Sequence, residues 1–514
     1  MAMTMEAEMM ADEAPPQQVR AQPTEPSRNT EQYERAPETG FVSVHDEPLS
    51  TFSVDVDTAS YSNVRRFLMH GQQPPPEAVR VEEMLNYFSY RDAEPRGDHP
   101  VAVTTELAES PFDGRRTLVR IGIKARELEQ RDDDRPRARN LVFLVDVSGS
   151  MQDRNKLPLL VRSLELLTEQ LGENDRVSIV TYAGSSGVLL EPTRGDQSRR
   201  ILDALHGLRA GGSTHGSAGI EDAYRMAERH RIRGGINRVI LATDGDFNVG
   251  VTSRGGLEHL IEEKRERGIF LTVLGFGMGN LKDATMEMLA DKGNGNYAYI
   301  DTEREARKVL VQEMQATLNT VAKDTKIQVE LNPARVARYR LIGYDNRRLE
   351  NRDFNDDRRD AGDMGDGHSI TALYELELRD RSSSGNRAEV DPLRYQHDRR
   401  PRPTAKSDEL MMVKIRYKRP DEDHSRLLST AVTGRAKRLS KASEDMRFAT
   451  AVAGFGLILR GSAHTGALRL RDVERLADGA IGDDRNGYRR ELVELVGRAR
   501  ELMGEYVEFA ERRY

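Results

Sequence analysis

The chain has 514 residues, no cysteine and a formal net charge of −7, with acidic and basic residues interspersed along it. This length corresponds to about three domains of ordinary size. The absence of cysteine excludes a disulfide framework and a thiolate metal site. No concentrated basic patch marks a nucleic-acid-binding surface, so nucleic acid is not expected as a partner. The longest apolar stretch, residues 448–459, is too short to span a bilayer, which predicts a buried helix and no integral membrane segment.

The N-terminal part divides into two segments. Residues 1–45 are rich in Met, Glu, Pro and Gln and lack a hydrophobic period, so they are predicted to be disordered. Residues 1–18 are acidic and lack the apolar core of a signal peptide. Residues 46–138 are predicted to form an N-terminal domain with a strand at 50–57, helices at 63–69 and 77–87, and strands at 101–107 and 117–124.

A second pattern of alternate polar residues lies at the start of this domain. Asp55, Asp57, Ser60 and Ser62 superficially resemble a metal-binding loop. We interpret the pattern instead as turn and helix-capping chemistry by Asp57 and Thr58.

Residues 139–322 alternate between apolar strands and amphipathic helices. The pattern predicts an α/β fold, a doubly wound and mostly parallel sheet with helices on both faces. Its strands are expected at 141–145, 176–182, 187–191, 238–242, 269–274 and 297–300, and its closing helix at 303–321. Ligands of such sheets bind at the carboxyl ends of the strands, where the strand order reverses.

Oxygen-bearing side chains follow two of these strands and one glycine-rich loop. The candidate metal ligands are Asp146, Ser148, Ser150, Thr214 and Asp244. One carboxylate and two hydroxyls alternate after the strand at 141–145, and a glycine between the hydroxyls allows a tight turn. Oxygen ligands of this kind suit a small hard cation. Gly149 and Asp246 are expected to support the ligands without binding the metal directly.

The order Asp-x-Ser-x-Ser, then Thr, then Asp resembles the metal-ion-dependent adhesion site of the von Willebrand factor type A family. The resemblance implies Mg²⁺, or Mn²⁺ in its place, held directly by the hydroxyls and by the aspartates directly or through water. It also implies an open coordination position that accepts an Asp or Glu side chain from a partner protein. The glycine-rich stretches 211–212 and 275–279 match neither nucleotide-binding fingerprint, so no nucleotide is expected.

The C-terminal part is predicted to hold a strand-rich segment at 323–435, with a polar loop at 379–407, and a helical segment at 436–514. The strands at 101–107 and 117–124 are too few to be stable alone. We therefore expect them to join downstream strands in one β-sandwich, into which the α/β domain is inserted.

Further stretches resemble a bacterial family with an N-terminal von Willebrand-associated domain, a type A domain and a C-terminal domain of the YfbK type. These stretches are residues 51–61, 79–90, 349–357, 360–368 and 448–462. The resemblance implies a location in the cell envelope or periplasm, although residues 1–18 do not look like a signal peptide.

The function predicted from these patterns is non-enzymatic, cation-dependent binding of a protein. Two alternatives stay open: a structural scaffold with a stabilising metal, and a metal-dependent hydrolase. The hydrolase would need a general base near the cation, and no residue can be assigned that role because the aspartates would be occupied by the metal.

Overall fold

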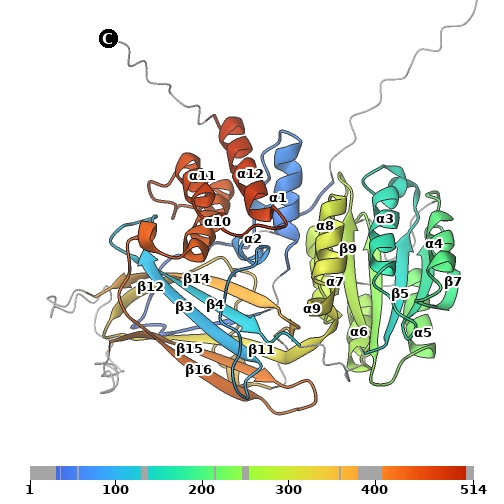
Figure 1. Cartoon of the computed structure of the whole chain (residues 1–514), viewed down its shortest axis with the longest axis horizontal. Helices are drawn as coiled ribbons and strands as arrows, with labels where there is room; N and C mark the ends of the chain where they lie inside the picture. The colour runs from blue at the N-terminus through green and yellow to red at the C-terminus, as the bar shows by residue number, and fades with distance from the viewer. Residues whose placement is uncertain are drawn as a thin grey trace, which may run out of the picture.

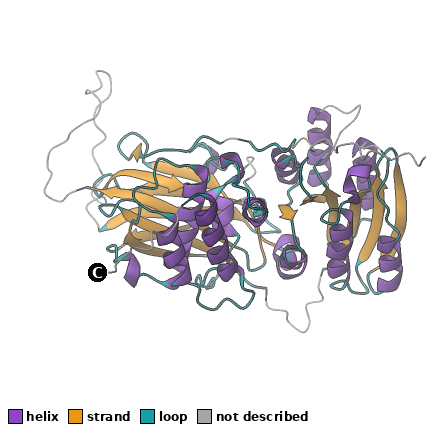
Figure 2. Cartoon of the chain, turned by 90° about the horizontal axis from the view of Figure 1, so that it is seen from above, coloured by secondary structure: helices purple, strands orange, loops and turns teal. Residues whose placement is uncertain are grey.

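The computed structural model describes residues 30–34, 36–54, 57–128, 137–212, 216–245, 254–357, 361–379 and 408–504. An α/β unit lies beside a β-sandwich, and a group of helices covers one side of the sandwich (Figure 1). The view from above places the α/β unit at one end of the molecule and the sandwich with its helices at the other (Figure 2). Within the described ranges, no helix has the length and apolar character needed to cross a membrane.

The α/β unit is built on a six-stranded sheet in the order β10-β9-β8-β5-β6-β7. Neighbouring strands are parallel except for the antiparallel pair β6–β7 at one edge. The strands are β5 (Arg139–Asp146), β6 (Arg176–Tyr182), β7 (Ser186–Arg194), β8 (Ile236–Thr243), β9 (Phe270–Phe276) and β10 (Tyr297–Ile300). The strand order reverses between β5 and β8, so the predicted doubly wound, mostly parallel sheet is confirmed.

Alternate residues of β5 enter the cores on the two faces of this sheet. Leu141, Phe143 and Val145 belong to one core, with α3, α4 and the closing helices. Val142 and Leu144 belong to the other, with α5, α6 and α7. The helices are α3 (Leu157–Thr168), α4 (Ser198–His206), α5 (Gly216–Arg229), α6 (Arg254–Glu266), α7 (Asp283–Lys292), α8 (Glu303–Arg307) and α9 (Met314–Leu318).

The closing helix is not continuous, contrary to the prediction for residues 303–321. It consists of α8, a π-helical turn at Lys308–Gln312, and α9. The next strand already begins at Thr320. Residues 320 and 321 therefore belong to the sandwich, where β11 (Thr320–Leu331) pairs with strands on both sides.

Two antiparallel sheets form the sandwich, one in the order β1-β12-β14-β4-β3 and the other β13-β11-β15-β16, with β2 paired to β11. The strands are β1 (Val42–Ser43), β2 (Leu49–Ser53), β3 (Val101–Glu109), β4 (Thr117–Ala125), β11 (Thr320–Leu331), β12 (Val336–Ile342), β13 (Met364–Gly365), β14 (Ser369–Leu378), β15 (Glu409–Lys418) and β16 (Arg426–Thr433). β4 precedes the α/β unit and pairs with β14, which follows it. The predicted insertion of the α/β unit into a β-sandwich is thus confirmed.

A helical layer packs next to the sandwich and shares one hydrophobic core. Its members are α1 (Ala59–Met69), α2 (Val81–Asn86), α10 (Glu444–Arg460), α11 (Leu470–Asp478) and α12 (Tyr488–Leu502). Most side chains of α10 are buried, as the apolar stretch 448–459 predicts. N-terminal and C-terminal helices therefore form one unit, although more than 350 residues of sequence separate α2 from α10.

The expectation of disorder over residues 1–45 is wrong for residues 30–34 and 36–45. Thr30 and Gln32 donate backbone hydrogen bonds to the carbonyls of Gly279 (2.7 Å) and Leu281 (2.9 Å). Glu31 pairs with the buried Arg66 at 2.7 Å. A polar sequence is held here by distant partners, which composition does not reveal. Residues 1–29 lie outside the described residues.

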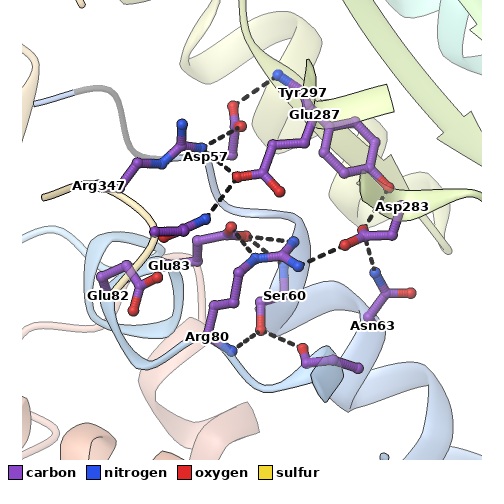
Figure 3. Close-up of polar contacts among 12 residues, drawn as sticks. Asp57, Ser60, Asn63, Arg80, Glu82, Glu83, Asp283, Glu287, Tyr297 and Arg347 are labelled. Atoms are coloured by element: carbon purple, nitrogen blue, oxygen red, sulfur yellow. Dashed lines mark hydrogen bonds and ion pairs between the residues drawn. The ribbon is translucent and has the colours of Figure 1, made fainter. Parts of the chain in front are cut away.

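A buried polar network joins the α/β unit to the N-terminal helices (Figure 3). Arg80, just before α2, contacts Asp283 at the start of α7 at 2.5 Å and also pairs with Glu83. The hydroxyl of Tyr297 donates to Asp283 at 3.0 Å. Because Arg80, Glu83 and Asp283 are 7%, 0% and 0% exposed, their mutual contacts replace those with water.

Asp57 belongs to the same network, and this corrects its interpretation as a capping residue. Its carboxylate accepts from the backbone N–H of Tyr297 at 2.8 Å and from Arg347 at 3.3 Å. Thr58 is the N-cap of α1 but makes no side-chain capping bond. Asp55 lies outside the described residues.

The network contains more carboxylates than cations. Arg80 and Arg347 face Asp57, Glu83, Asp283 and Glu287. Burial is the main cause that raises the pKa of Glu83 to about 7, and the charges of Glu287 and Asp283 add to it, against the lowering effect of Arg80. A proton on Glu83 relieves this excess of negative charge.

We predict that Glu83 makes the junction more stable at mildly acidic pH. Its folded pKa lies above the ordinary value of 4.5, so its stabilising contribution is complete below pH 4.5 and is lost as the pH rises through 7. The melting temperature should therefore fall between pH 5.5 and 8.5, and Glu83→Gln should reduce that fall. Glu94→Gln is the control, since that side chain is 59% exposed. Equal pH dependence in wild type and Glu83→Gln would contradict the prediction.

We also predict that residues 46–138 do not fold alone, because β4 pairs with β14 and the side chains of β3 and β4 share one core with those of β11 and β15 in the opposite sheet. The domain boundaries at 46–138, 139–322, 323–435 and 436–514 stay predictions. Residues 140–322 expressed alone should melt cooperatively, and 46–138 should aggregate unless co-expressed with 323–514. A soluble fragment 46–138 with cooperative melting would show the expectation to be mistaken.

Candidate metal centre

Asp146 ends the central strand β5 and is fully buried. Its Oδ1 accepts a hydrogen bond from the backbone N–H of Ser148 at 2.9 Å. Its Oδ2 accepts from the hydroxyls of Tyr182 at 3.2 Å and Thr243 at 3.1 Å. Three strands, β5, β6 and β8, thereby fix one carboxylate at the carboxyl edge of the sheet.

The serine loop brings two hydroxyl oxygens together beside Asp146. The Oγ atoms of Ser148 and Ser150 lie 3.0 Å apart. Gly149 does not adopt a positive φ; instead, its N–H donates to the carbonyl of Gly212 at 3.0 Å. A Cβ at Gly149 would meet that carbonyl at 3.4 Å. A glycine is therefore favoured at this position because the loop at 211–212 lies so close, and not because the backbone makes a left-handed turn.

Asp244 follows β8 and faces this loop. It is fully buried, and Ser150 donates a hydrogen bond to it. The ammonium of Lys156 lies 2.9 Å from its Oδ2 and 3.3 Å from Oδ1 of Asn280. Lys156 immediately precedes α3, and Asn280 lies between β9 and α7, so two further elements meet at Asp244.

The two aspartates have opposite pKa shifts. Burial raises the pKa of Asp146 to about 6, and the charge of Asp244 contributes to the rise. Burial would also raise the pKa of Asp244, but the hydrogen bond from Asn280 and the charge and hydrogen bond of Lys156 lower it overall. Asp244 thus ionises more readily than a free aspartate, and Asp146 ionises less readily.

The structure brings together four of the five predicted ligands, namely Asp146, Ser148, Ser150 and Asp244. Thr214 lies outside the described residues, as does Asp246. The backbone bond between Gly149 and Gly212 ends two residues before Thr214, so the described part of that loop lies against the serine loop. Among the described residues, no group of three or more His, Cys, Asp or Glu side chains could hold a metal. The candidate centre therefore depends on hydroxyls together with two carboxylates.

These residues fit a small hard cation. The Ser148 and Ser150 hydroxyls would hold it with the carboxylates of Asp146 and Asp244, and neutral and anionic oxygens are the donors that Mg²⁺ and Mn²⁺ take. The repulsion between Asp146 and Asp244 is the kind that a bound cation relieves.

Sequence reasoning missed four residues of this site: Lys156, Tyr182, Thr243 and Asn280. Thr243 adjoins a predicted ligand, and its place at the end of a buried strand is a usable signal. The others come from separate elements and carry no motif. Only the packing of the loops brings them to the aspartates.

The fold and the serine loop define a protein with a von Willebrand factor type A domain, and comparison with family models agrees. The model described as "von Willebrand factor type A domain" matches residues 140–317. A model described as "von Willebrand factor" matches residues 27–120. The model described as "Uncharacterized protein YfbK, C-terminal" matches residues 316–502.

The chain belongs to the family of the uncharacterized protein YfbK of Escherichia coli (strain K12). It is 44% identical to that protein over 474 residues, which cover 91% of this chain and 80% of that protein. It is also 27% identical to human inter-alpha-trypsin inhibitor heavy chain H4 over 30% of this chain and 18% of that protein. A match to the magnesium-chelatase 60 kDa subunit of Rhodobacter capsulatus is 35% identical over 23% of this chain and 21% of that protein.

Among solved structures, the chain is similar to a von Willebrand factor type A protein from Catenulispora acidiphila. That similarity has a TM-score of 0.41 and 17% identity and covers 78% of this chain and 91% of the other. The ArnB paralog VWA2 from Sulfolobus acidocaldarius gives a TM-score of 0.36 and 13% identity, covering 79% of this chain and 98% of the other.

We predict that Gly245→Ala disrupts the loop that presents Asp244. Gly245 has a φ of +102°, and an added Cβ would lie 2.7 Å from the backbone nitrogen of Lys282. Strain alone costs roughly 1–3 kcal/mol, and the clash with backbone adds to it. Gly279→Ala is a matched control, because its φ is +93° but a Cβ there meets nothing within 4 Å. Chemical denaturation should show a clearly larger loss of unfolding free energy for Gly245→Ala, and equal losses would contradict the prediction.

Proposed function

We propose that this protein binds a partner protein without enzymatic turnover, through a divalent cation held by Asp146, Ser148, Ser150, Thr214 and Asp244. The observation that supports this most is the placement of two hydroxyls 3.0 Å apart beside a buried aspartate at the carboxyl edge of the sheet. When bound, Mg²⁺ or Mn²⁺ would supply an electrophilic position for a carboxylate of the partner.

The chain's own residues favour binding over catalysis. Both oxygens of Asp146 accept hydrogen bonds, from Ser148, Tyr182 and Thr243, and Asp244 pairs with Lys156. When the cation is bound, both aspartates would be engaged as its ligands, which leaves neither of them free to act as a general base. The residues are arranged to hold their oxygens in place rather than to move a proton.

Exposed apolar side chains near the same edge of the sheet support a protein as the ligand. Val188 and Leu189, on the edge strand β7, are 45% and 42% exposed, and Val188 pairs with Val180, two residues before the end of β6. Met278, in the loop that carries Asn280, is 38% exposed. Apolar area beside a polar anchor is typical of a protein interface, whose core is apolar and whose specificity comes from a few polar groups.

The first test is metal binding by calorimetry. Wild type should bind one Mg²⁺ or Mn²⁺, and the double variant Ser148→Ala with Asp244→Ala should not. Ser429→Ala, an exposed hydroxyl on β16, is the control and should bind as wild type does. Unchanged binding by the double variant would overturn the assignment of the site.

The second test separates binding from a structural role of the metal. Proteins captured from the native cell lysate with Mg²⁺ should be lost with a chelator and lost with Thr214→Ala, while the melting temperature of that variant changes little. A large fall in melting temperature upon chelation, with capture unaffected, would instead support a metal that stabilises the fold. Metal-dependent turnover of a substrate would overturn the non-enzymatic assignment.

A further inference from the structure

Lys156 places a fixed positive charge inside the candidate metal centre. The residue is 5% exposed, and its ammonium lies 2.9 Å from Asp244 and 3.3 Å from the side-chain oxygen of Asn280. The ammonium touches the same carboxylate that accepts a hydrogen bond from Ser150. It is therefore part of the site's charge and not a distant counter-ion.

The fold provides a dedicated path for the lysine stem. Gly277 has a φ of +78°, and any Cβ at that position would collide with the methylene groups of Lys156. The carbonyl of Gly277 accepts a hydrogen bond from the buried hydroxyl of Tyr299, which fixes the loop against the stem. The loop at Gly277 encloses the stem of Lys156, and Asp244 and Asn280 hold its ammonium. Contacts along the whole side chain therefore fix the position of the charge.

We propose that Lys156 tunes this site: it weakens binding of the divalent cation itself and strengthens binding of a partner carboxylate by the loaded site. The inference rests on the proposed function. Asp146 and Asp244 carry two negative charges, and the serine hydroxyls are neutral. A divalent cation alone would cancel those charges, whereas with Lys156 present the loaded site has a net charge of about +1 by the same count.

A site with excess positive charge attracts an anion at the open position. Because the ammonium and the bound cation would both lie close to Asp244, they repel each other and the metal is held less tightly. An incoming carboxylate of the partner, in contrast, is attracted by both the ammonium and the bound cation, so it binds more tightly. Lys156 thus lowers the affinity of the site for the metal and raises the affinity of the loaded site for a carboxylate.

The test uses the full chain, with Mn²⁺ as the metal and acetate as the carboxylate. Water proton relaxation reports both the binding of Mn²⁺ and the displacement of water from the bound Mn²⁺ by acetate. Lys156→Met should bind Mn²⁺ roughly tenfold more tightly than wild type, as expected for removing a like charge near the ion. Acetate should displace water from the loaded Lys156→Met variant only at several-fold higher concentration than from wild type. Unchanged or weaker Mn²⁺ affinity, or an unchanged acetate response, would overturn the proposal.

Two further variants complete the design. Lys326→Met removes another buried lysine, paired with Asp324 at 3.0 Å in the sandwich, and should leave Mn²⁺ and acetate binding unchanged. Asn280→Asp keeps Lys156 and adds a negative charge beside it, so Mn²⁺ affinity should rise several-fold and acetate affinity should fall. This variant decides the question if Lys156→Met does not fold, and no change in it would overturn the proposal.

The proposed function and this inference fail in different ways. If wild type binds no Mn²⁺, the metal centre itself is wrong. If wild type binds Mn²⁺ and acetate but Lys156→Met and Asn280→Asp behave as wild type does, the metal centre stands and only the role of Lys156 is wrong.

Discussion

The buried ion pair between Arg80 and Asp283 links the α/β unit to the rest of the molecule. Both side chains are buried, so each depends on the other and on Glu83, Tyr297 and Asn63. Removing one partner of such a pair leaves an uncompensated buried charge, which costs about 3–5 kcal/mol. Asp283 begins α7 only three residues after Asn280. The contact that joins the two bodies therefore also fixes one end of the loop that supports the candidate metal centre.

A second buried cluster reinforces this junction from the other side of α1. Arg65 contacts Asp301 and Glu305 of the α/β unit and Glu491 of α12. One guanidinium thus connects three segments that are far apart in sequence. Since planar guanidinium groups bind carboxylates in fixed geometries, the two arginine clusters add directional contacts between the α/β unit and the helical layer. Both clusters contact the α/β unit just after a strand of its sheet, because Asp301 directly follows β10 and Asp283 begins α7, the helix after β9.

The sequence was informative for features that depend on residues close together in the chain. The apolar run before Asp146 indicates a buried central strand, and the alternate oxygens after it indicate the serine loop. The insertion into the sandwich followed from counting strands. Lys156 and Asn280 could not be predicted, because 88 and 36 residues separate them from Asp244 and no local pattern ties them to it. Asp57 looked like a capping residue because its neighbours suit a cap, whereas its partners come from 240 and 290 residues away.

The strap formed by residues 30–33 has a practical consequence for how the molecule can be attached to anything else. Thr30 and Gln32 donate to the carbonyls of Gly279 and Leu281, on either side of Asn280. The side chain of Asn280 in turn contacts Lys156, which pairs with Asp244. A label, fusion partner or surface joined just ahead of Thr30 would stand beside the approach to the centre and compete for space with an incoming protein. Attachment beyond α12, on the helical layer, leaves that approach clear. The choice of attachment point could thus decide whether a binding assay detects a protein bound at the centre.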